Sequence, residues 1–440
     1  MEFFGRRDEI AELRRIRALS HAAAQFTVVT GRRRVGKTEL VRQALGDGAD
    51  LFVYLLVTRQ NERTLVRGLQ RAVEEAGLPV LGQATRVAEL LDVVAKAARM
   101  RPVTLVIDEF QELDRINPSA FGEIQGIWDA CHREAKLNLV VCGSVNRLMR
   151  KVFFNYAEPL YGRNTGHLRL QPFGTALLKE ILASYRPAYT PQDLLTLWTL
   201  TGGVPRYVQL LLDGRAVTHA KMIEAVLSPT SSFLDEGRTI LAEEFGADYE
   251  TYFSVLSEIA SGRTTFGELA NSVGSEVGTC LSRLENEYGL IRRIVPLFDR
   301  EKSRNTHYAL EDCFLRFWFR FVFKYRGWIE LGRLRELQDL VRRDFPTFTG
   351  YALERYFHQK LREETSCTAL GGWWDRKGEN EIDLVCEDEP NGTLDFYEVK
   401  VDAGRFDASV LDRKIAAFLE KNPRFKSRPH AAHGLSLKDM

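Results

Sequence analysis

The chain has 440 residues, of which 45% are hydrophobic and 28% are charged, so it is long enough for about three globular domains and is not disordered. Its 61 basic and 60 acidic residues leave a net charge of +1, which excludes a uniformly basic nucleic-acid-binding surface and leaves only local patches. The six cysteines lack metal-ligand spacing, and we expect reduced thiols in a cytoplasmic protein. No apolar run reaches the roughly 20 residues that span a bilayer, so we expect no membrane partner.

The first motif with chemical meaning lies in residues 26–40, where a β-rich run leads into Gly-x-x-x-x-Gly-Lys-Thr and then a helical pattern. This is a P-loop in the strand–loop–helix context that it requires. Glycines let the backbone wrap phosphate groups, and the helix N-terminus adds positive potential. We expect Lys37 to contact the β- and γ-phosphates of ATP and Thr38 to bind Mg²⁺. The predicted nucleotide contacts of this loop are Gly31, Arg34, Val35, Gly36, Lys37 and Thr38.

Two further apolar runs each end in polar residues, as buried parallel strands do at the sheet edge where ligands bind. The first ends in Asp108 and Glu109. We expect Asp108 to hold Mg²⁺ through water and Glu109 to polarise the attacking water, which predicts a hydrolase. The second ends in Ser144, a predicted sensor of the γ-phosphate, with Asn146 as second choice and a plain helix cap as the alternative. Strands that alternate with helices predict an α/β fold with a parallel sheet covered on both faces.

Together with FFGRRDEIAELRRI, PLYGRNTGHLRLQPF and TGGVPRY, these motifs resemble the prokaryotic "archaeal ATPase" family, a branch of the AAA+-like and STAND P-loop ATPases. The resemblance implies an ATPase core at residues 1–172 and a helical lid at residues 173–245. It also implies that Arg163 faces a γ-phosphate, in the same subunit or in a neighbour, so that a homo-oligomer is possible. A surface salt bridge is the alternative for Arg163. Pro205 of the lid would sense the nucleotide.

The sequence pattern changes at residues 246–325, where three helical patterns precede two strand-like runs around a charged loop. This order is typical of a winged helix-turn-helix module. Its third helix carries several glutamates, which phosphates repel, so DNA contact would rest on the basic loop at residues 299–304. The alternative is a packing domain that relays the nucleotide state. The stretch YALEDCFLRFWFRFVF resembles the junction of this family with a C-terminal domain of unknown function.

The last segment, residues 326–440, carries a helix with Glu354 and then two strand-like runs joined by the turn DEPNG. Glu398 and Lys400 alternate along the second run and therefore share a face, and Asp383 opposes them across the hairpin. Charges on a half-buried strand should be paired or should bind a metal.

This pattern of Asp…Glu-x-Lys on a hairpin flanked by helices resembles the PD-(D/E)xK nuclease superfamily, with its restriction-endonuclease-like α/β fold. The resemblance implies that Asp383 and Glu398 ligate Mg²⁺, that Lys400 positions or activates the attacking water, and that Glu354 completes the site. Ile382 stands where the superfamily has proline. The expected function is an ATP-regulated DNA nuclease in defence or mobile-element biology. The alternative is a non-cleaving STAND-type switch that oligomerises and binds DNA or protein, with the charged hairpin as a structural ion-pair cluster.

Aromatic and basic residues around this hairpin are secondary candidates. Trp373 and Trp374 are expected to pack the sheet, with stacking of an unpaired base as the alternative. The basic residues that are candidate phosphate contacts are Arg376, Lys377, Arg413, Lys414, Lys421, Arg424 and Lys426.

Overall fold

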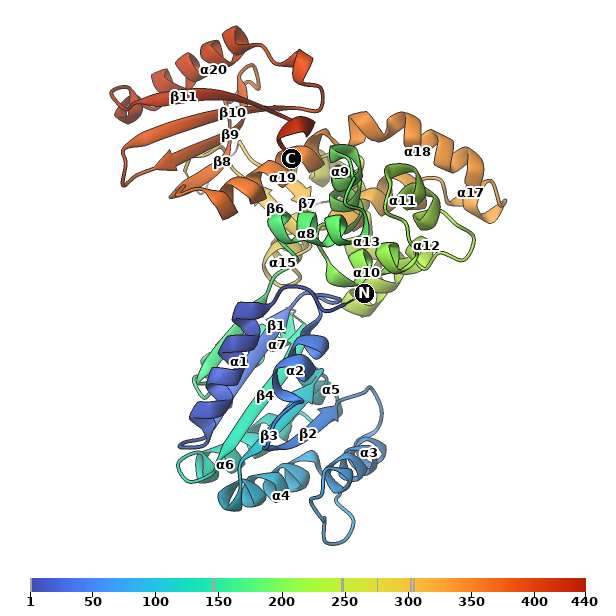
Figure 1. Ribbon diagram of the computed structural model, residues 1–440, viewed down its shortest axis with the longest axis vertical. Helices are drawn as coiled ribbons and strands as arrows, with labels where there is room; N and C mark the ends of the chain where they lie inside the picture. Colours follow the sequence, from blue (N-terminus) through green and yellow to red (C-terminus); the bar gives the residue numbers. More distant parts are fainter. Residues whose placement is uncertain (1, 145–146, 247–248, 275, 301–302, 304) are drawn as a thin grey trace. The chain divides into compact units, whose positions relative to one another are not determined.

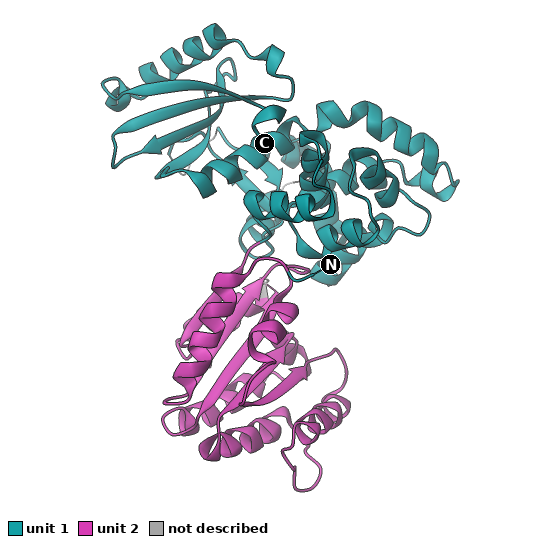
Figure 2. Cartoon of the chain, viewed as in Figure 1, with its two compact units in different colours: residues 1–3, 172–440 teal, residues 4–171 magenta. Residues whose placement is uncertain are grey.

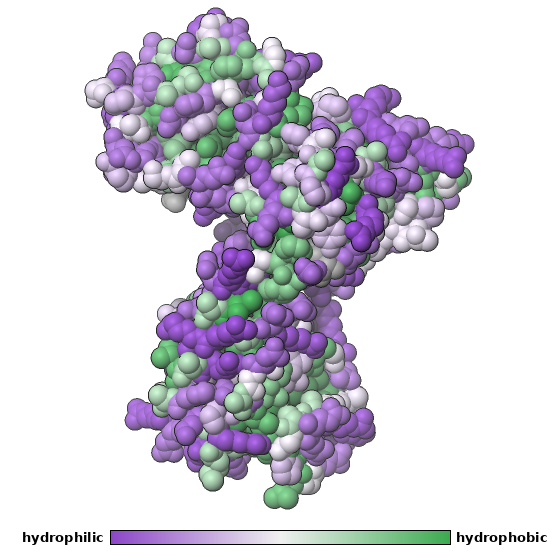
Figure 3. All heavy atoms as spheres, viewed as in Figure 1, coloured by the Kyte–Doolittle hydropathy of each residue, from purple (hydrophilic) through white to green (hydrophobic). Residues whose placement is uncertain are grey.

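The computed structural model describes residues 2–144, 147–246, 249–274, 276–300, 303 and 305–440 (Figure 1). These residues form two compact units, one of residues 4–171 and one of residues 172–440 with the first residues of the chain (Figure 2). Asn146 lies outside the described residues, and so do residues 301, 302 and 304 of the basic loop. The face of each unit that Figure 3 shows is largely hydrophilic.

The unit of residues 4–171 is built on a five-stranded sheet of order β2-β3-β4-β1-β5, in which every pair of neighbours is parallel. Its strands are β1 Gln25–Gly31, β2 Leu51–Leu56, β3 Val103–Asp108, β4 Leu137–Ser144 and β5 Gly166–Leu170. Its main helices are α1 Arg7–Ser20, α2 Lys37–Leu45, α3 Glu62–Glu75, α4 Val87–Met100, α5 Leu113–Ile116, α6 Ala120–Cys131 and α7 Arg147–Phe154. Strands β3 and β4 are buried along their whole length, as their continuous apolar runs require.

Two hydrophobic clusters cover the two faces of this sheet. One joins the strands to α1 and α2, and the other joins them to α3, α4, α6 and α7. The predicted parallel sheet with helices on both faces is therefore confirmed. The carboxyl ends of β1, β3 and β4 lie at one edge, which brings the P-loop beside the polar residues that end β3 and β4.

The second unit begins with a helical region. Its helices are α8 Thr175–Tyr185, α9 Pro191–Thr201, α10 Pro205–Asp213, α11 His219–Val226 and α12 Phe233–Phe245.

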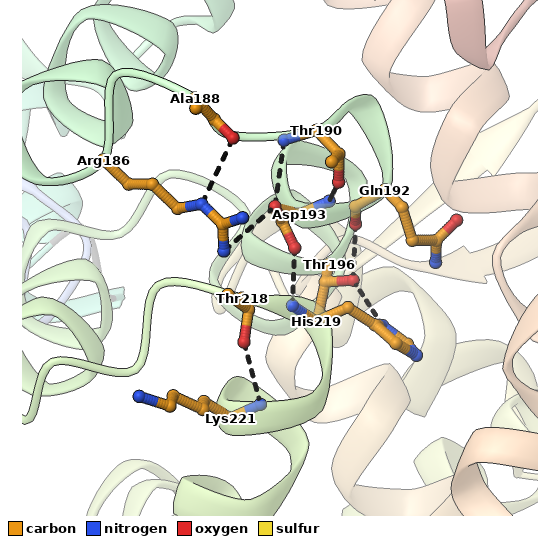
Figure 4. Close-up of polar contacts among 9 residues, drawn as sticks. All are labelled: Arg186, Ala188, Thr190, Gln192, Asp193, Thr196, Thr218, His219 and Lys221. Carbon is orange, nitrogen blue, oxygen red and sulfur yellow. Dashed lines mark hydrogen bonds and ion pairs between the residues drawn. The ribbon is translucent and has the colours of Figure 1, made fainter.

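One buried carboxylate organises two of these helices (Figure 4). Asp193 forms a capping box with Thr190 at the start of α9, and its other oxygen accepts the backbone N–H of His219 at 2.7 Å, at the start of α11. The His219 ring pairs with the hydroxyl of Thr196 at 2.8 Å, and Arg186 lies 3.9 Å from the Asp193 carboxylate. Asp193 therefore satisfies orphan amides of both helices.

The middle of this unit has three helices, α13 Tyr249–Ala260, α14 Phe266–Val273 and α15 Val277–Asn286, and then an antiparallel pair, β6 Ile291–Ile294 and β7 His307–Leu310. Helix α16, Cys313–Phe317, follows and widens into a π-helical turn at residues 318–323. Trp318 of this turn lies on Gly237 of α12, where an added Cβ would meet the indole ring at 2.2 Å. Helices α17, Arg326–Glu330, and α18, Leu334–Phe348, complete the region.

The end of the chain forms a mixed four-stranded sheet of order β11-β10-β9-β8. Its elements are α19 Gly350–Glu364, β8 Ala369–Trp374, β9 Glu381–Asp388, β10 Thr393–Lys400, α20 Ala408–Lys421 and β11 His430–Ser436. Strands β8, β9 and β10 are antiparallel, and β11 is parallel to β10. Helix α20 packs its apolar side on one face, and α19 contacts the same three antiparallel strands.

One expectation about the cysteines was wrong. Cys367 and Cys386 form a disulfide, with their Cα atoms 5.5 Å apart, whereas Cys131, Cys142, Cys280 and Cys313 are free and buried. The segment before β8 runs antiparallel to β9, which places the two cysteines side by side. Their separation in the chain carries no signal for this pairing, because only the strand register brings them together. No described helix has the length and apolar character needed to cross a bilayer.

Candidate functional site

The P-loop lies between β1 and α2 and curls tightly. Arg34 and Gly36 have positive φ angles of 66° and 87°, so two left-handed residues turn the chain toward the helix. At Gly31 an added Cβ would lie 3.0 Å from a backbone oxygen of β5 and 2.9 Å from the Val35 side chain. Only glycine therefore fits at the end of β1. The loop that follows leads directly into the N-terminus of α2, which is a favourable place for an anion.

Lys37 opens α2 and is 7% exposed. Its Nζ donates to the carbonyl oxygens of Gly31 at 3.0 Å and of Arg32 at 3.2 Å. Burial lowers the pKa of Lys37, and the nearby negative charge of Glu109 opposes this change. The structure thus places the ammonium group inside the loop, beside the acidic end of β3.

Asp108 is the hub of this edge of the sheet. Its Oδ2 accepts the hydroxyl of Thr38 at 2.6 Å and that of Tyr54 at 2.7 Å, and its Oδ1 accepts the amide of Glu109 at 2.9 Å. Burial and the bond to Asp108 raise the pKa of Tyr54. A hydroxyl beside a carboxylate is a set of hard oxygen ligands that suits Mg²⁺. Thr38 and Asp108 therefore meet as the motif predicts, and Tyr54 is a partner that sequence reasoning missed.

Glu109 adopts a left-handed backbone with φ 53°, and its Oε2 accepts the Nε2 of Gln111 at 2.5 Å. Gln111 is 2% exposed, and among the described residues its Oε1 has no hydrogen-bond partner. An added Cβ at Gly143 would lie 2.4 Å from that oxygen. Gly143 therefore leaves the space that Gln111 fills. Gln111 was missed from the sequence, and the signal that could have indicated it is its place two residues after Glu109.

Ser144 ends β4 and is 4% exposed. It pairs in register with Gly31, the first glycine of the P-loop. The predicted γ-phosphate sensor thus lies beside the loop that would hold the phosphates. Its role remains a prediction.

Arg163 is engaged by an acidic side chain. Its Nε and Nη2 donate to the carboxylate of Asp129 on α6 at 3.0 and 2.9 Å, and its Nη1 donates to the carbonyl of Pro159 at 2.8 Å. These contacts match the salt-bridge alternative, and a role at a γ-phosphate stays a prediction. Pro205 is the first residue of α10 and belongs to the other unit, so its predicted contact with nucleotide is likewise untested.

The second cluster lies on the β9–β10 hairpin. Glu398 is 7% exposed, and its Oε1 accepts the Nζ of Lys400 at 2.7 Å. Lys414 of α20 donates to both oxygens of Glu398 at 2.9 Å. The predicted sharing of a face by Glu398 and Lys400 is thus present. Lys414, expected on the surface as a phosphate contact, instead bonds the buried carboxylate, since α20 covers this end of the sheet.

Asp383 faces the same end of the hairpin. The ladder between β9 and β10 stops at the pair Leu384 and Tyr397, and beyond it Asp383 Oδ2 accepts the amide of Val399 at 2.6 Å. Lys400 Nζ lies 3.7 Å from the same oxygen. Burial and the charge of Glu398 raise the pKa of Asp383 to about 6, although the bond from Val399 works in the opposite direction.

Glu354 of α19 adds a third carboxyl group. Burial, followed by the charges of Asp383 and Glu381, raises the pKa of Glu354 to about 8. Burial acts against the charged form of Lys400, but its bond to Glu398 and the charge of Asp383 outweigh this and raise its pKa. The structure therefore brings Asp383, Glu398 and Lys400 together, and Glu354 lies on α19, which contacts β9 and β10.

The fit of this cluster to a metal ion is partial. Asp383 and Glu398 offer carboxylate oxygens of the type that Mg²⁺ takes. Over the part of the chain that the structure describes, no group of three or more histidine, cysteine, aspartate or glutamate side chains is arranged to hold a metal ion. The oxygens of Glu398 are bonded by two ammonium groups, so a metal would compete with Lys414 for them.

Comparison with known families assigns the front of the chain. Residues 3–211 match a family described as an ATPase domain predominantly from Archaea. We refer to these matched residues as the archaeal-type ATPase domain. Residues 318–411 match a family described as archaeal and bacterial proteins of unknown function. An uncharacterized protein of Methanocaldococcus jannaschii is 28% identical over 385 residues, which cover 86% of this chain and 82% of that protein.

Two solved structures share the fold of the archaeal-type ATPase domain and its neighbouring regions. A Walker-type ATPase of Pyrococcus abyssi has a TM-score of 0.52 at 17% identity and covers 72% of this chain and 96% of its own. The ORC2 protein of Aeropyrum pernix, in complexes with ADPNP and ADP, has a TM-score of 0.51 at 16% identity, with 77% and 94% covered. The P-loop and the acidic end of β3 give the archaeal-type ATPase domain the groups that phosphoryl transfer needs.

Proposed function

We propose that the chain is an ATPase that regulates a metal-dependent nuclease-like site near its C-terminal end, with DNA as the substrate. The observation that carries this proposal is the convergence of Asp383, Glu398 and Lys400 where β9 and β10 separate, with the Lys400 ammonium 2.7 Å from Glu398 and 3.7 Å from Asp383. The order α19-β8-β9-β10-α20-β11, with β11 parallel to β10, supports it. This order agrees with the restriction-endonuclease-like fold that the sequence resembles.

The ATPase half works through groups that already meet at one edge of the parallel sheet. Lys37 neutralises the β- and γ-phosphates, and Thr38 with Asp108 supplies the oxygens that bind Mg²⁺. Glu109 orients the attacking water, and its bond to Gln111 holds the carboxylate in place. This arrangement supports hydrolysis rather than binding alone.

The nuclease-like half relies on charge placement. Asp383, Glu398 and the carbonyl of Val399 are the hard donors that would hold Mg²⁺, and when bound this ion supplies an activated water and neutralises the phosphate. Lys400 places a cation beside the scissile phosphate. Burial and the charges of Asp383 and Glu381 raise the pKa of Glu354 to about 8, so this carboxyl holds a proton near neutral pH while no metal is bound, and it would complete the site from α19.

The test is cleavage of plasmid and single-stranded DNA with Mg²⁺ or Mn²⁺, with and without ATP. We expect Glu398→Ala to lose cutting and keep ATP hydrolysis, and Lys37→Ala to lose ATP hydrolysis and the ATP dependence of cutting. Glu420→Ala is the matched control, because this glutamate is exposed on α20 and outside the cluster. Equal cutting by Glu398→Ala and the wild type would refute the nuclease proposal.

A second candidate function is a non-cleaving ATP-driven switch. Lys414 favours it, since this residue bonds both oxygens that a metal would need. In this case Asp383, Glu398 and the two lysines are a structural ion-pair cluster. The deciding measurement is Mn²⁺ affinity: no loss of affinity in Asp383→Ala would favour the switch, and clear loss would favour the nuclease-like site.

Two further parts of the proposal concern DNA docking and assembly. The order of α13, α14, α15, β6 and β7 supports a winged helix-turn-helix at residues 246–325, which either docks on DNA or relays the nucleotide state. Action of Arg163 on a neighbouring subunit would require Asp129 to release it. Mixing Lys37→Ala with Arg163→Ala subunits tests this: recovered ATPase activity would indicate a homo-oligomer, and none would refute action between subunits.

A further inference from the structure

A cavity of about 470 Å³ opens within the second unit, with residues 296–299, 303 and 305 on one side and β8 on the other. The end of α20 supplies the rest of its wall. Pockets for small ligands typically measure about 300–1,000 Å³. This cavity therefore suits a ligand the size of one nucleotide and is too small for a DNA duplex.

The wall of the cavity is fixed in place. The amide of Leu297 donates to the carbonyl of Gly372 in β8 at 2.8 Å. The ring of Phe298 lies 4.7 Å from that of Phe425, and the guanidinium of Arg424 lies 4.9 Å above the Phe298 ring. A backbone bond and an aromatic cluster thus hold residues 296–298 on the C-terminal sheet, so the cavity is a built feature.

An oriented aromatic ring lines the cavity. Trp374 is half-buried, its Nε1 donates to the Oδ1 of Asn305 at 3.0 Å, and the ring of His307 lies 5.4 Å away. Trp373 differs, since it is 4% exposed and packs on Phe418. Trp373 is therefore a core residue, whereas Trp374 is partly exposed in the lining of the cavity, where its indole ring can stack on a planar ligand.

Two cations stand at the rim. Arg376 and Lys421 are exposed, and neither side chain makes an ion pair or hydrogen bond with any residue that the structure describes. Asp299 also lines the cavity, but its oxygens accept the hydroxyl of Ser303 at 2.7 Å and the amide of Arg300 at 2.8 Å. The donors of Arg376 and Lys421 are therefore available to an anionic group, whereas the carboxylate of Asp299 is already hydrogen-bonded.

The geometry points to a binding site for a single unpaired nucleotide, with its base on Trp374 and its phosphate between Arg376 and Lys421. A base with an attached phosphate could come from two sources, an unpaired DNA strand or a free mononucleotide. Trp374 pairs with Glu381 in the ladder of β8 and β9, two residues or about 7 Å along the strand from Asp383. Its value as a strand-reading site thus rests on the proposed function, because it would hold a base beside the nuclease-like site.

The experiment measures binding to the full-length chain in EDTA, where metal-dependent cutting is blocked. The probe is a fluorescein-labelled oligothymidylate of about ten nucleotides, within the size range of single-strand-binding folds. We expect Trp374→Ala to weaken binding about tenfold or more, Trp374→Phe to keep most of it, and Lys421→Glu to weaken it as well. Trp328→Ala and Lys221→Glu are matched controls outside the lining, and we expect both to bind like the wild type.

Further measurements distinguish an unpaired strand from a free mononucleotide, and failure of this inference from failure of the proposed nuclease function. Competition by thymidine monophosphate would show that the site takes a free nucleotide, and its absence with tight oligonucleotide binding would assign it to a strand. The same oligonucleotide annealed to its complement is the duplex probe. The inference would be overturned if this duplex bound as tightly as the single strand and its binding were unaffected by Trp374→Ala and Lys421→Glu. It would also be overturned if the single strand did not bind at all. Loss of DNA cutting with this binding intact would instead overturn the nuclease proposal alone.

Discussion

Replacing Glu354 by glutamine should change how the stability of the protein depends on pH. The pKa of this carboxyl is raised from 4.5 to about 8 by burial and by the charges of Asp383 and Glu381. Between these values the folded protein keeps a proton that the unfolded chain releases. The free energy of unfolding therefore falls by up to about 1.4 kcal/mol per pH unit as the pH rises.

The stabilising contribution of Glu354 is fully present below pH 4.5 and is lost as the pH passes through about 8. Over this window the loss is on the order of 5 kcal/mol. Glutamine has the same shape and no proton to lose. We expect Glu354→Gln to match the wild type near pH 5 and to be more stable near pH 8, with a melting temperature higher by roughly 5–15 °C.

The assay is thermal unfolding of the full-length chain at several pH values from 5 to 8, followed by the tryptophan signal. Glu364→Gln is the control, because this glutamate is exposed on the same helix and its loss should leave the pH dependence of the wild type. Part of the slope at low pH should survive in Glu354→Gln, since the pKa of Asp383 is also raised to about 6. Parallel stability curves for the wild type and Glu354→Gln across the whole range would refute the reasoning.

Three other predictions concern Glu109, Asp193 and Lys414. Glu109→Gln should bind ATP as the wild type does but hydrolyse it about 10²–10⁴-fold more slowly, whereas Lys37→Ala should lose binding; equal turnover by Glu109→Gln would contradict this. Asp193→Ala should lower the free energy of unfolding by about 2–4 kcal/mol, because α9 and α11 both lose an N-terminal acceptor, and an unchanged melting curve would show that this contact is dispensable. Lys414→Met should raise Mn²⁺ affinity about tenfold by freeing Oε2 of Glu398, as calorimetry would report, and weaker binding would show that the lysine supports the metal site instead.

The ATPase edge could be predicted where residue spacing fixes geometry. The P-loop pattern specifies a turn and a helix start, so Lys37 and Thr38 fall where the motif places them, and Asp108 meets Thr38 at 2.6 Å. Tyr54 and Gln111 escaped because their contacts depend on which strands are neighbours and on the space left by a glycine. Neither condition leaves a periodic mark in the sequence.

The C-terminal cluster could also be predicted only in part from the sequence. Alternation along β10 predicted that Glu398 and Lys400 share a face, because side chains in a strand repeat every two residues. Lys414 could not be assigned, since its helix looks like any amphipathic surface helix until its packing on the sheet is known. The disulfide between Cys367 and Cys386 likewise depends on the strand register alone.

Helix α19 explains how the parts of the second unit depend on one another. Near its middle, Arg355 donates to the carbonyl and carboxylate of Glu311, each at 2.6 Å, at the end of the β6–β7 hairpin. Near its end, the carboxylate of Glu363 accepts the amide of Thr175 at 3.0 Å, at the start of α8. Glu354 lies on the same helix next to Arg355, and the charge of Asp383 helps to raise its pKa. A 15-residue helix is a stiff rod of about 22 Å, so movement of α8 that carries Glu363 must also move Glu354, or break one of these bonds. The protonation of Glu354 therefore depends on contacts made by the helical region and the hairpin as well as on the strands beside it.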